Sequence, residues 1–469
     1  MNKYLYIMGV AAVMMTAASC KVGKEYSRPS VDMPKAFRGQ PTADTNSIAA
    51  LPIHSFIRDT ALLALIDSAL TRNFDVQIAL KNIDAASQSL RTARMGRLPA
   101  VDLQIQGTRN WPSKNSLNGS LSEQFIGTRY MDDYSANVAL TWEVIAWGKI
   151  SRLKEAALAT YLQSAEASKA VQTRVISDVA QAYYNLLMLD TQKDVAYKNK
   201  QLSDSTLRIV KLQYASGMAT NLAVEQTEAQ LRVSMALIPQ IEQQITLQEN
   251  ALKVLVGEMP GSIVRNSLQS MTADTALSAG VPASLLSRRP DVRAAEMAVK
   301  VANARAGVAQ AAMYPALNIT AGVGVNSFKI NNWLNIPGSL FETVGGSITQ
   351  PIFRRRQLKT EWETAKIEWE KSAIEFKRSV VGAVQEVSDA LAKMDKLQQQ
   401  YTFTQQRVDR LEIATHDASL LFQNGMANYL EVITAQSNAL QSELDLAAVK
   451  RDQLNAAVDL YRALGGGWK

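Results

Sequence analysis

The chain contains two copies of one sequence unit, set about 210 residues apart. Arg94–Leu103 aligns with Gln310–Ile319, and Tyr214–Ala219 aligns with Phe422–Ala427. Each unit has the pattern of a helix, a strand, a loop, a second strand, a very long helix, a glycine turn and a last helix. Because both units repeat this order, we expect a fold made of two related halves.

Four segments alternate apolar and polar residues, which is the period of a strand with one apolar face. Pro99 and Pro315 stand where a helix should give way to a strand, since proline continues neither hydrogen-bond ladder. The apolar positions of the four segments are Val101, Leu103 and Ile105; Val138, Leu140, Trp142 and Val144; Leu317, Ile319, Val323 and Val325; and Val344, Ile348 and Ile352. Aromatic residues near the expected strand ends suit an interfacial girdle, and these are Trp111, Tyr130, Tyr134, Phe328 and Trp333.

Four strands of roughly ten residues could cross an outer membrane, but they are too few to close a barrel, which needs about eight. An open sheet in lipid would leave backbone donors and acceptors unsatisfied along both of its edges. Strands in lipid would therefore require several copies of the chain. A soluble sandwich with one wet face remains compatible with the alternation alone.

Two segments, Ile150–Gln213 and Leu358–Leu421, contain no proline and hardly a glycine, and each predicts a helix roughly 95 Å long. Apolar residues at coiled-coil spacing recur in the second segment and in the last helix, and two apolar stripes run along the first segment. A helix with two stripes has two neighbours, as in a wall of helices, although an ordinary long helical bundle gives the same pattern. Pro239 is expected to break the helix that follows Leu222. The residues in these patterns are Val380, Val384, Val387, Leu391 and Met394; Leu440, Leu444, Ala447, Arg451, Leu454, Val458 and Tyr461; Val171, Val175, Val179, Ala182 and Leu186; and Ile176, Tyr183 and Leu187.

The beginning of the chain has the pattern of a lipoprotein signal peptide. Lys3 precedes an apolar run, Tyr4–Met15, that is too short to span a bilayer as a mature helix. Small residues then lead to Cys20, the only cysteine, so lipid attachment is a better role for it than a disulfide within the chain. An ordinary signal peptide with a chance cysteine is the alternative, and Lys21 in place of aspartate is weakly typical of sorting to the outer membrane.

Charge and residue usage argue against nucleic-acid binding and against catalysis. The net charge is +7 and the pI about 9.2, but basic and acidic residues alternate along the helices, as on a solvated face. His54 and His416 are the only histidines, and neither a Gly-x-Ser-x-Gly elbow nor a His-Glu-x-x-His helix occurs. Two histidines also argue against a dedicated imidazole metal site. The pair Asp132–Asp133 is expected in an extracellular loop, as a hydrated turn rather than an acid–base dyad.

Four motifs together resemble the TolC/OprM-like family of outer-membrane efflux proteins, in particular its lipoprotein subgroup that serves resistance–nodulation–division pumps. They are Val22–Pro29 after the lipobox, Leu255–Gly261, Leu285–Glu296 with its Arg-Arg-Pro-Asp sequence, and Tyr461–Trp468 at the end. The resemblance covers nearly the whole mature chain.

The resemblance implies an α+β membrane protein without enzymatic activity. Three copies would supply four strands each to one twelve-stranded outer-membrane β-barrel, continued by a long periplasmic α-helical barrel with an equatorial domain. The expected function is a passive exit duct in a tripartite efflux system, and the expected partners are a periplasmic adaptor, an inner-membrane resistance–nodulation–division transporter and outer-membrane lipid. No cofactor is expected apart from the covalent lipid on Cys20, and no nucleic acid. Type I protein secretion and a structural helical lipoprotein remain as alternatives.

The expected division of the chain follows the two repeats: signal peptide, 1–19; lipidated N-terminal segment and equatorial region, 20–60; helix of repeat one, 61–98; β-hairpin of repeat one, 99–146; long helices of repeat one, 147–259; equatorial linker, 260–289; helix of repeat two, 290–314; β-hairpin of repeat two, 315–354; long helices of repeat two, 355–464; and C-terminal tail, 465–469.

The resemblance also implies two kinds of functional residue. Its glycine turns lie at the periplasmic tip, so Gly217, Met218, Ala219 and Thr220, and likewise Gly425, Met426 and Ala427, are candidate docking points for the adaptor, besides the plain role of a helix-ending glycine. The family carries aspartates that narrow the tunnel mouth after the second turn. Matching the glycines gives Glu431 one such position, Thr434 another without a carboxylate, and Asn428 beside them; a solvent-facing glutamate is the alternative for Glu431.

Overall fold

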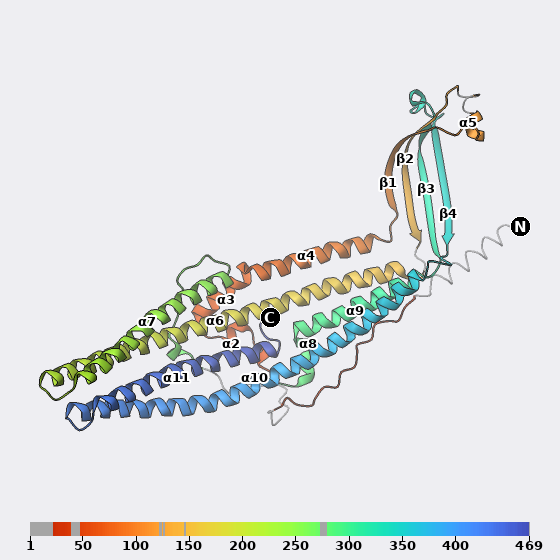
Figure 1. The fold of residues 1–469 in the computed structure, drawn as a ribbon. Coiled ribbons are helices and arrows are strands. Elements are labelled where there is room, and N and C mark those ends of the chain that lie inside the picture. The colour runs from red at the N-terminus through yellow and green to blue at the C-terminus, as the bar shows by residue number, and fades with distance from the viewer. Residues whose placement is uncertain are drawn as a thin grey trace. The chain divides into compact units, whose positions relative to one another are not determined.

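The computed structural model describes residues 22–38, 47–121, 124, 127–144, 147–272 and 279–468 (Figure 1). The expected signal peptide 1–19 and Cys20 lie outside the described residues. The chain divides into two compact units: unit 1 holds residues 1–28, 85–162 and 297–374, and unit 2 holds residues 29–84, 163–296 and 375–469.

The repeat seen in the sequence is confirmed element by element. Three long helices of the first repeat each have a counterpart of equal length in the second: 22 residues, then 67, then 35. The matched pairs are α4 (Phe74–Met95) and α9 (Pro290–Ala311), β1 (Ala100–Asn110) and β3 (Ala316–Ser327), β2 (Met131–Val144) and β4 (Leu340–Thr349), α6 (Lys149–Ala215) and α10 (Gln357–Gln423), and α7 (Asn221–Leu255) and α11 (Tyr429–Ala463). Shorter elements lie between them: η1 (Ile48–Ala50), α2 (Ile53–Phe56), α3 (Thr60–Arg72), α5 (Leu117–Leu121), η3 (Leu268–Ser270), η4 (Pro282–Ser284), α8 (Leu285–Arg288) and η5 (Ile330–Asn332).

Unit 1 contains an antiparallel sheet in the order β1-β2-β3-β4. Its register aligns the four apolar stripes on one face, because directly opposed residues point to the same side of a sheet. Leu103 lies opposite Val138, and Val138 lies opposite Val323. The other face is polar, with Asn137 opposite Gln104. The four predicted strands are thus confirmed, and the outer edges of β1 and β4 pair with no other described strand.

Two details of the predicted sheet are wrong. Ile352 is not a strand residue, because β4 ends at Thr349. Asp132 and Asp133 lie within β2 and not in a loop. A strand accepts these charges because they are paired across it: Arg109 on β1 donates two hydrogen bonds to Asp132, at 2.6 and 2.8 Å, and the amide of Asn326 on β3 donates to Asp133.

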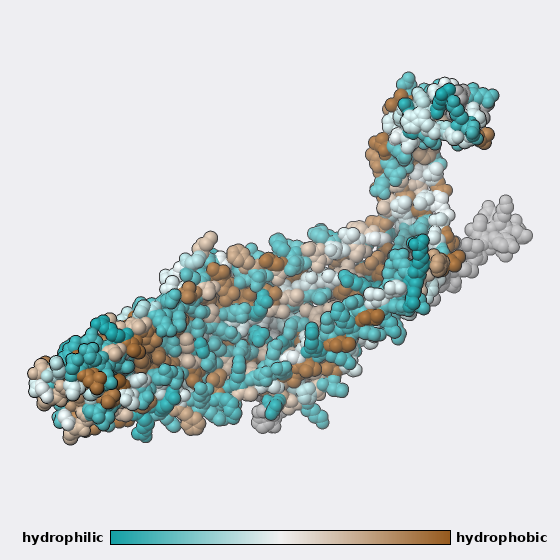
Figure 2. Space-filling model, in the orientation of Figure 1, coloured by the Kyte–Doolittle hydropathy of each residue, from teal (hydrophilic) through white to brown (hydrophobic). Residues whose placement is uncertain are grey.

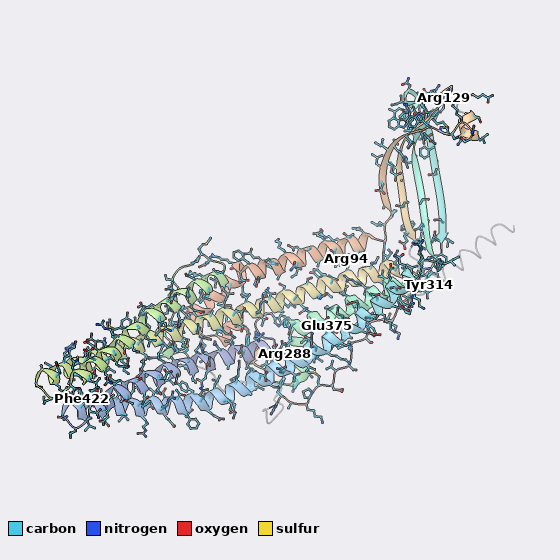
Figure 3. All side chains as sticks on the ribbon, viewed as in Figure 1. Arg94, Arg129, Arg288, Tyr314, Glu375 and Phe422 are labelled. Atoms are coloured by element: carbon cyan, nitrogen blue, oxygen red, sulfur yellow. The ribbon has the colours of Figure 1, made fainter. Side chains whose placement is uncertain are left out.

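The aromatic residues named from the sequence gather at the loop end of the sheet. Trp111 directly follows β1, Tyr130 directly precedes β2, and Phe328 directly follows β3. Tyr134 is in β2 opposite Gly107, near the end of β1, and Trp333 directly follows η5 in the loop between β3 and β4. Figure 3 labels Arg129, which lies at this end. Their placement at strand ends is therefore confirmed, while a girdle in lipid stays a prediction.

Unit 2 is built of helices whose predicted apolar stripes are buried. On α6, Val179 belongs to one stripe and Tyr183 and Leu187 to the other, and all three are fully buried. On α10 the stripe residues Val380 and Val387 are buried as well. The two-stripe interpretation of α6 is therefore confirmed. Within the described part of the chain, no helix combines the length and the apolar composition needed to cross a membrane.

Two helix boundaries differ from those expected. Pro239 does not break the helix, because α7 runs from Asn221 to Leu255 with the proline inside it. Proline removes one backbone donor, but Ile238 and Ile241 beside it are buried, and this packing keeps the helix continuous. The expected helix 61–98 is divided into α3 and α4 at Asn73, whose Oδ1 accepts from the backbone N–H of Val76 and whose Nδ2 donates to the Leu255 carbonyl at 2.7 Å.

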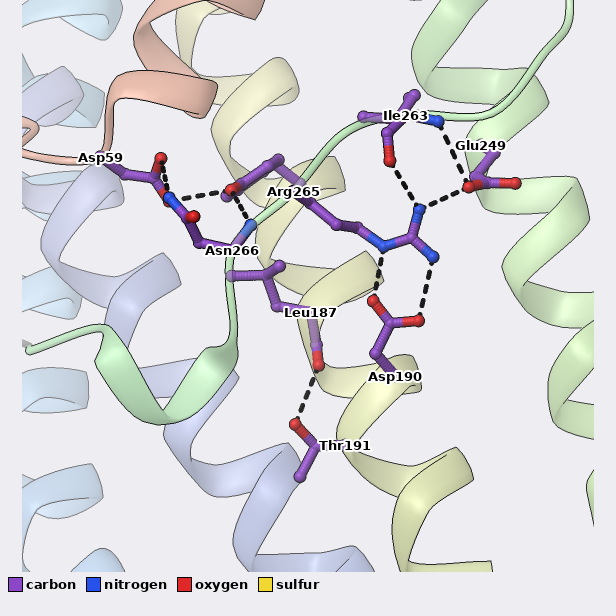
Figure 4. A network of polar contacts seen from close by, with 9 residues as sticks. Asp59, Leu187, Asp190, Thr191, Glu249, Ile263, Arg265 and Asn266 are labelled. Atoms are coloured by element: carbon purple, nitrogen blue, oxygen red, sulfur yellow. Dashed lines mark hydrogen bonds and ion pairs between the residues drawn. The ribbon is translucent and has the colours of Figure 1, made fainter. Parts of the chain in front are cut away.

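A polar network in unit 2 fixes the segment that follows α7 (Figure 4). Arg265 donates to both carboxylate oxygens of Asp190 on α6, at 2.5 and 2.9 Å, and also to Glu249 on α7. These hydrogen bonds, above all those to Asp190, raise the pKa of the Arg265 guanidinium above its usual value. Next to it, the side-chain amide of Asn266 donates to Asp59 at 2.9 Å. The segment therefore connects α6 and α7 through charge-assisted hydrogen bonds.

Candidate functional site at the two hairpin turns

The two glycine turns have the same backbone geometry. Gly217 and Gly425 have φ of 75° and 73°, a left-handed conformation that favours glycine. In each turn the next residue closes the helix: the N–H of Met218 donates to the Gln213 carbonyl and that of Met426 to the Leu421 carbonyl, both at 2.8 Å. These are the bonds of a Schellman helix ending, so the plain structural role of both glycines is established.

Each turn presents exposed apolar side chains, and three of them recur at matched positions of both repeats. Met218 is 76% exposed and Met426 70%, although methionine usually packs inside a protein. The spacing that relates Gly217 to Gly425 relates the flanking exposed leucines as well: Leu212 to Leu420 and Leu222 to Leu430. Figure 2 shows hydrophobic side chains at the hairpin ends. A recurring exposed apolar set is typical of a contact surface.

A small core joins the two hairpins just behind their turns. Its buried members come from all four helices: Val210 on α6, Ala223 on α7, Phe422 on α10 and Val432 on α11. Figure 3 labels Phe422, beside the second turn. The Tyr429 hydroxyl also donates to Gln226 Oε1 on α7 at 2.6 Å. The two turns therefore form one packed tip, and the exposed residues on both belong to one surface, which we call the hairpin tip.

Charged residues connect the two helices of the first hairpin. Glu228 on α7 accepts from Arg232 at 3.1 Å and lies 3.5 Å from the ammonium nitrogen of Lys211 on α6. The hydrogen bond from Arg232, followed by the charge of Lys211, lowers the pKa of the Glu228 carboxyl. All three groups are on the surface, so their contribution to stability is small.

The three residues expected at the aperture lie together near the start of α11. Asn428, Glu431 and Thr434 are spaced by three residues, which places them along one side of the helix, and all three are exposed. Asn428 caps the helix, and its Oδ1 accepts from the Glu431 N–H at 3.1 Å. Its amide lies 3.4 Å from Glu431 Oε1. Glu431 thus has a local contact with the capping residue Asn428, besides any role in a pore.

The matched positions of the first repeat carry no carboxylate. Thr220 caps α7 as Asn428 caps α11, with its hydroxyl accepting from the Ala223 N–H at 3.3 Å. By the glycine alignment, Ala223 stands where Glu431 does, and Gln226 stands where Thr434 does. At these two matched positions, the only carboxylate therefore comes from the second repeat.

Sequence reasoning missed two features of the tip. The hydrogen bond from Tyr429 to Gln226 joins residues from different repeats and has no local signal. The repeated leucines could have been found, because the repeat alignment already shows the identities. Among the described residues, no cluster of three or more His, Cys, Asp or Glu side chains is arranged to hold a metal ion.

Comparisons with known proteins agree on one family. A family model described as outer membrane efflux protein matches residues 65–258 and 281–466. The solvent efflux pump outer membrane protein SrpC of Pseudomonas putida is 30% identical over 97% of each chain. The cation efflux system protein CusC of Escherichia coli O6:H1 is 28% identical over 97% of this chain and 98% of its own. A crystal structure of CusC, described as concerning folding and transmembrane channel formation, superposes with a TM-score of 0.82 at 26% identity, covering 96% of this chain and all of the other.

Proposed function

Because the chain belongs to the outer membrane efflux protein family, we propose that three copies join their sheets into one twelve-stranded cylinder across the outer membrane. The protein is an outer-membrane efflux channel, and its family consists of channels rather than enzymes. The cylinder would be the exit duct, and the helices would continue it into the periplasm.

The observation that carries the proposal is the sheet itself. Its apolar face is exposed in the single chain: Leu103 is 69% exposed, Ile105 67% and Val344 86%. Its outer edges, along β1 and β4, have no partner among the described strands. Lipid would cover the apolar face, and only other copies could pair the edges, since unpaired edges in lipid are too costly. Four strands per chain are too few to close alone, and three copies is the number that the family resemblance implies.

The hairpin tip is the proposed docking surface for the periplasmic adaptor. Its support is the duplicated apolar set, with Met218 and Met426 as the most exposed members. The adaptor would connect the channel to an inner-membrane transporter of the resistance–nodulation–division class. The glycines would keep these turns tight, while the methionines and leucines would supply the adaptable contact area.

The proposed aperture is a ring of Glu431, with Asn428 and Thr434 beside it. Threefold symmetry would bring three copies of each side chain to one level, and carboxylates there would favour cations and repel each other. The two hydrogen bonds with the capping residue Asn428 support the geometry, because they hold Glu431 at the first turn of α11. The absence of a carboxylate at Thr434 makes this ring weaker than the one that the resemblance implies.

Lipid attachment at Cys20 is also part of the proposal. Two residues further on, the Val22 N–H donates to the Trp147 carbonyl at 3.3 Å, just after the end of β2. A lipid near this point would enter the membrane beside the sheet.

The test is reconstitution of the purified, lipidated protein. We expect an assembly with the mass of three chains that resists mild denaturation and gives steady conductance in a planar bilayer. A single-chain, water-soluble protein without conductance would contradict the channel and favour a structural lipoprotein. Cysteine crosslinking from position 426 to an adaptor in cells tests the tip, with exposed position 374 on α10 as the matched control. Association with an exporter of whole proteins would favour type I secretion.

A further inference from the structure

The strand-to-helix junctions of the two repeats share a strained backbone but differ in chemistry. Two successive residues are left-handed in each: Trp147 and Gly148 ahead of α6, with φ of 62° and 74°, and Arg355 and Arg356 ahead of α10, with φ of 48° and 65°. The number of residues between these two pairs is the same as that between Gly217 and Gly425, so the pairs occupy matched positions of the two repeats. Glycine adopts this conformation freely, whereas arginine is strained in it. Arg356 thus occupies the position in the second repeat that Gly148 occupies in the first.

The first junction is closed by the N-terminal segment. Trp147 donates to the Pro315 carbonyl at 2.8 Å and stacks on Tyr314, and its own carbonyl accepts from Val22. The buried Arg152 then donates to the carbonyls of Gly23 and Lys24, at 2.9 and 3.2 Å. The segment that follows the proposed lipid anchor is therefore bound to this junction. Figure 3 labels Tyr314 at this helical end of the sheet.

The second junction is exposed and amphipathic. Ile352 is 95% exposed and Phe353 83%, and three arginines follow them directly, Arg354, Arg355 and Arg356. Arg356 donates to Glu363 at 3.1 Å. In the described part of the chain, no carboxylate is within ion-pair distance of Arg354 or Arg355. Apolar side chains next to arginines form the composition of a membrane-interface anchor.

In the closed ring of three copies, arginines of the neighbouring copy would also lie beside the second junction. Pairing β4 of one copy with β1 of the next brings together the end of β4 and the start of β1, because antiparallel strands meet in this way. Arg94 and Arg97 precede β1 and are exposed. Two nearby carboxylates are already engaged, because Glu143 accepts from Lys149 at 2.9 Å and Glu363 accepts from Arg356. Asp102, the third residue of β1, is a single further carboxylate against four arginines. The contact between neighbouring copies would therefore have more arginines than carboxylates. A bound anion would neutralise this excess positive charge.

We propose that Ile352–Arg356 of each copy, with Arg94 and Arg97 of the next copy, binds the phosphate headgroup of an anionic phospholipid at the periplasmic surface of the outer membrane. The guanidinium fork matches phosphate oxygens, and Ile352 and Phe353 enter the acyl region beside it. The first junction would be tied to the membrane by the covalent lipid and the second by bound lipid. The inference rests on the proposed ring of three copies.

The experiment compares phosphatidylglycerol with phosphatidylcholine. The full-length protein is reconstituted in phosphatidylcholine nanodiscs, and the protein-bound fraction of spin-labelled lipid of each kind is measured. The variant R354Q/R355Q/R356Q should lose preference for phosphatidylglycerol by about fivefold for each unpaired arginine, and by less for Arg356, which has a carboxylate partner. Binding of phosphatidylcholine should not change. The matched control removes three exposed lysines of α10, as K366Q/K371Q/K377Q, and should leave the preference intact.

A second variant, R355G/R356G, separates lipid binding from folding. It relieves the left-handed strain, so it should fold at least as well as the unaltered protein. Because it keeps Arg354, it should lose about fivefold of the preference for Arg355 and a smaller factor for Arg356. Full retention of the preference in both arginine variants would overturn the proposal. So would dissociation of either variant into single chains, whatever the lipid, because the segment would then be a contact between copies. Conductance recorded on the unaltered protein from the same preparation reports separately whether the ring itself forms.

Discussion

One substitution on each face of β1 tests whether the sheet meets lipid. Ile105 is the middle residue of β1 and lies on the apolar face, in a row that continues across the sheet through Ala136, Val325 and Leu340. Gln104, the preceding residue, points to the polar face and lies opposite Asn137. Both side chains are exposed in the single chain, so neither substitution disturbs a packed core. Ile105→Arg and Gln104→Arg therefore differ only in the medium that receives the charge.

The two substitutions should differ strongly in the free-energy cost of inserting the sheet into lipid. An arginine on the lipid face near the bilayer midplane costs about 2–4 kcal/mol, whereas one on the lumen face costs little. Three copies raise the total for Ile105→Arg to about 6–12 kcal/mol, which is comparable with the whole stability of a typical domain. We therefore expect Ile105→Arg to prevent stable insertion and Gln104→Arg to be tolerated.

The assay is folding of urea-denatured protein into phosphatidylcholine vesicles, with the yield of denaturation-resistant oligomer read on a gel across a urea series. Ile105→Arg should shift the midpoint to much lower urea, and Gln104→Arg should stay near the unaltered protein. Equal shifts, or a larger shift for Gln104→Arg, would refute the assignment of the apolar face to lipid. A sheet that is wet on both faces should tolerate both arginines.

Three further predictions concern the helical part. Arg265→Ala removes the partner of two carboxylates, Asp190 and Glu249, which are only 28% and 15% exposed. It should lower the free energy of unfolding in a urea titration by about 1–3 kcal/mol, which is less than for a fully buried pair. An unchanged urea midpoint would contradict a stabilising role of the network. Glu431→Ala should increase passive conductance in a bilayer, while Glu431→Gln, which keeps a hydrogen-bonding side chain at the cap, separates charge from capping; unchanged conductance in both would reject the gate. Gly257→Ala should destabilise the protein more than Gly217→Ala, because an added Cβ at Gly257 would lie 2.3 Å from the Arg72 carbonyl oxygen, whereas Gly217 has open space. For Gly217→Ala the backbone strain alone costs about 1–2 kcal/mol. Equal losses of unfolding free energy in denaturant titrations would contradict this prediction.

Much of the fold follows from periodicity in the sequence. Residues such as Val101 and Leu103 recur at every second position because one face of the strand differs from the other, and Val179 and Leu186 recur at helical spacing because they are buried. The turns were also predictable, because Gly217 and Gly425 end long helical patterns and need a left-handed backbone.

The remaining features depend on contacts between distant residues. The charge of Asp132 argued for a loop, but Arg109 on the neighbouring strand satisfies it. Pro239 argued for a break, but burial of its neighbours keeps α7 intact. At the tip, the sequence located both glycine turns, but not the hydrogen bond between Tyr429 and Gln226 that joins the two hairpins. Local propensity gives no information about such partners.

The motifs that carry the family resemblance have a shared structural reason. Gly257 and Gly465 end α7 and α11 in the same left-handed conformation, with φ of 78° and 85°. Each lies against the backbone of an arginine that comes shortly before the first long helix of its repeat: Gly257 against Arg72, and Gly465 against Arg288. Only a residue without a side chain permits this approach.

Both repeats are therefore closed by the same contact, in which the last helix returns to the start of the first. In the second repeat Arg289 strengthens the closure: it is buried, donates to the Ala463 carbonyl at 3.0 Å and pairs with Asp291 and Glu386. Asn73 makes the corresponding bond in the first repeat, to the Leu255 carbonyl. The glycine and the polar group thus act together, because the glycine allows the backbones to touch and the polar side chain satisfies a helix-end carbonyl that the contact removes from water.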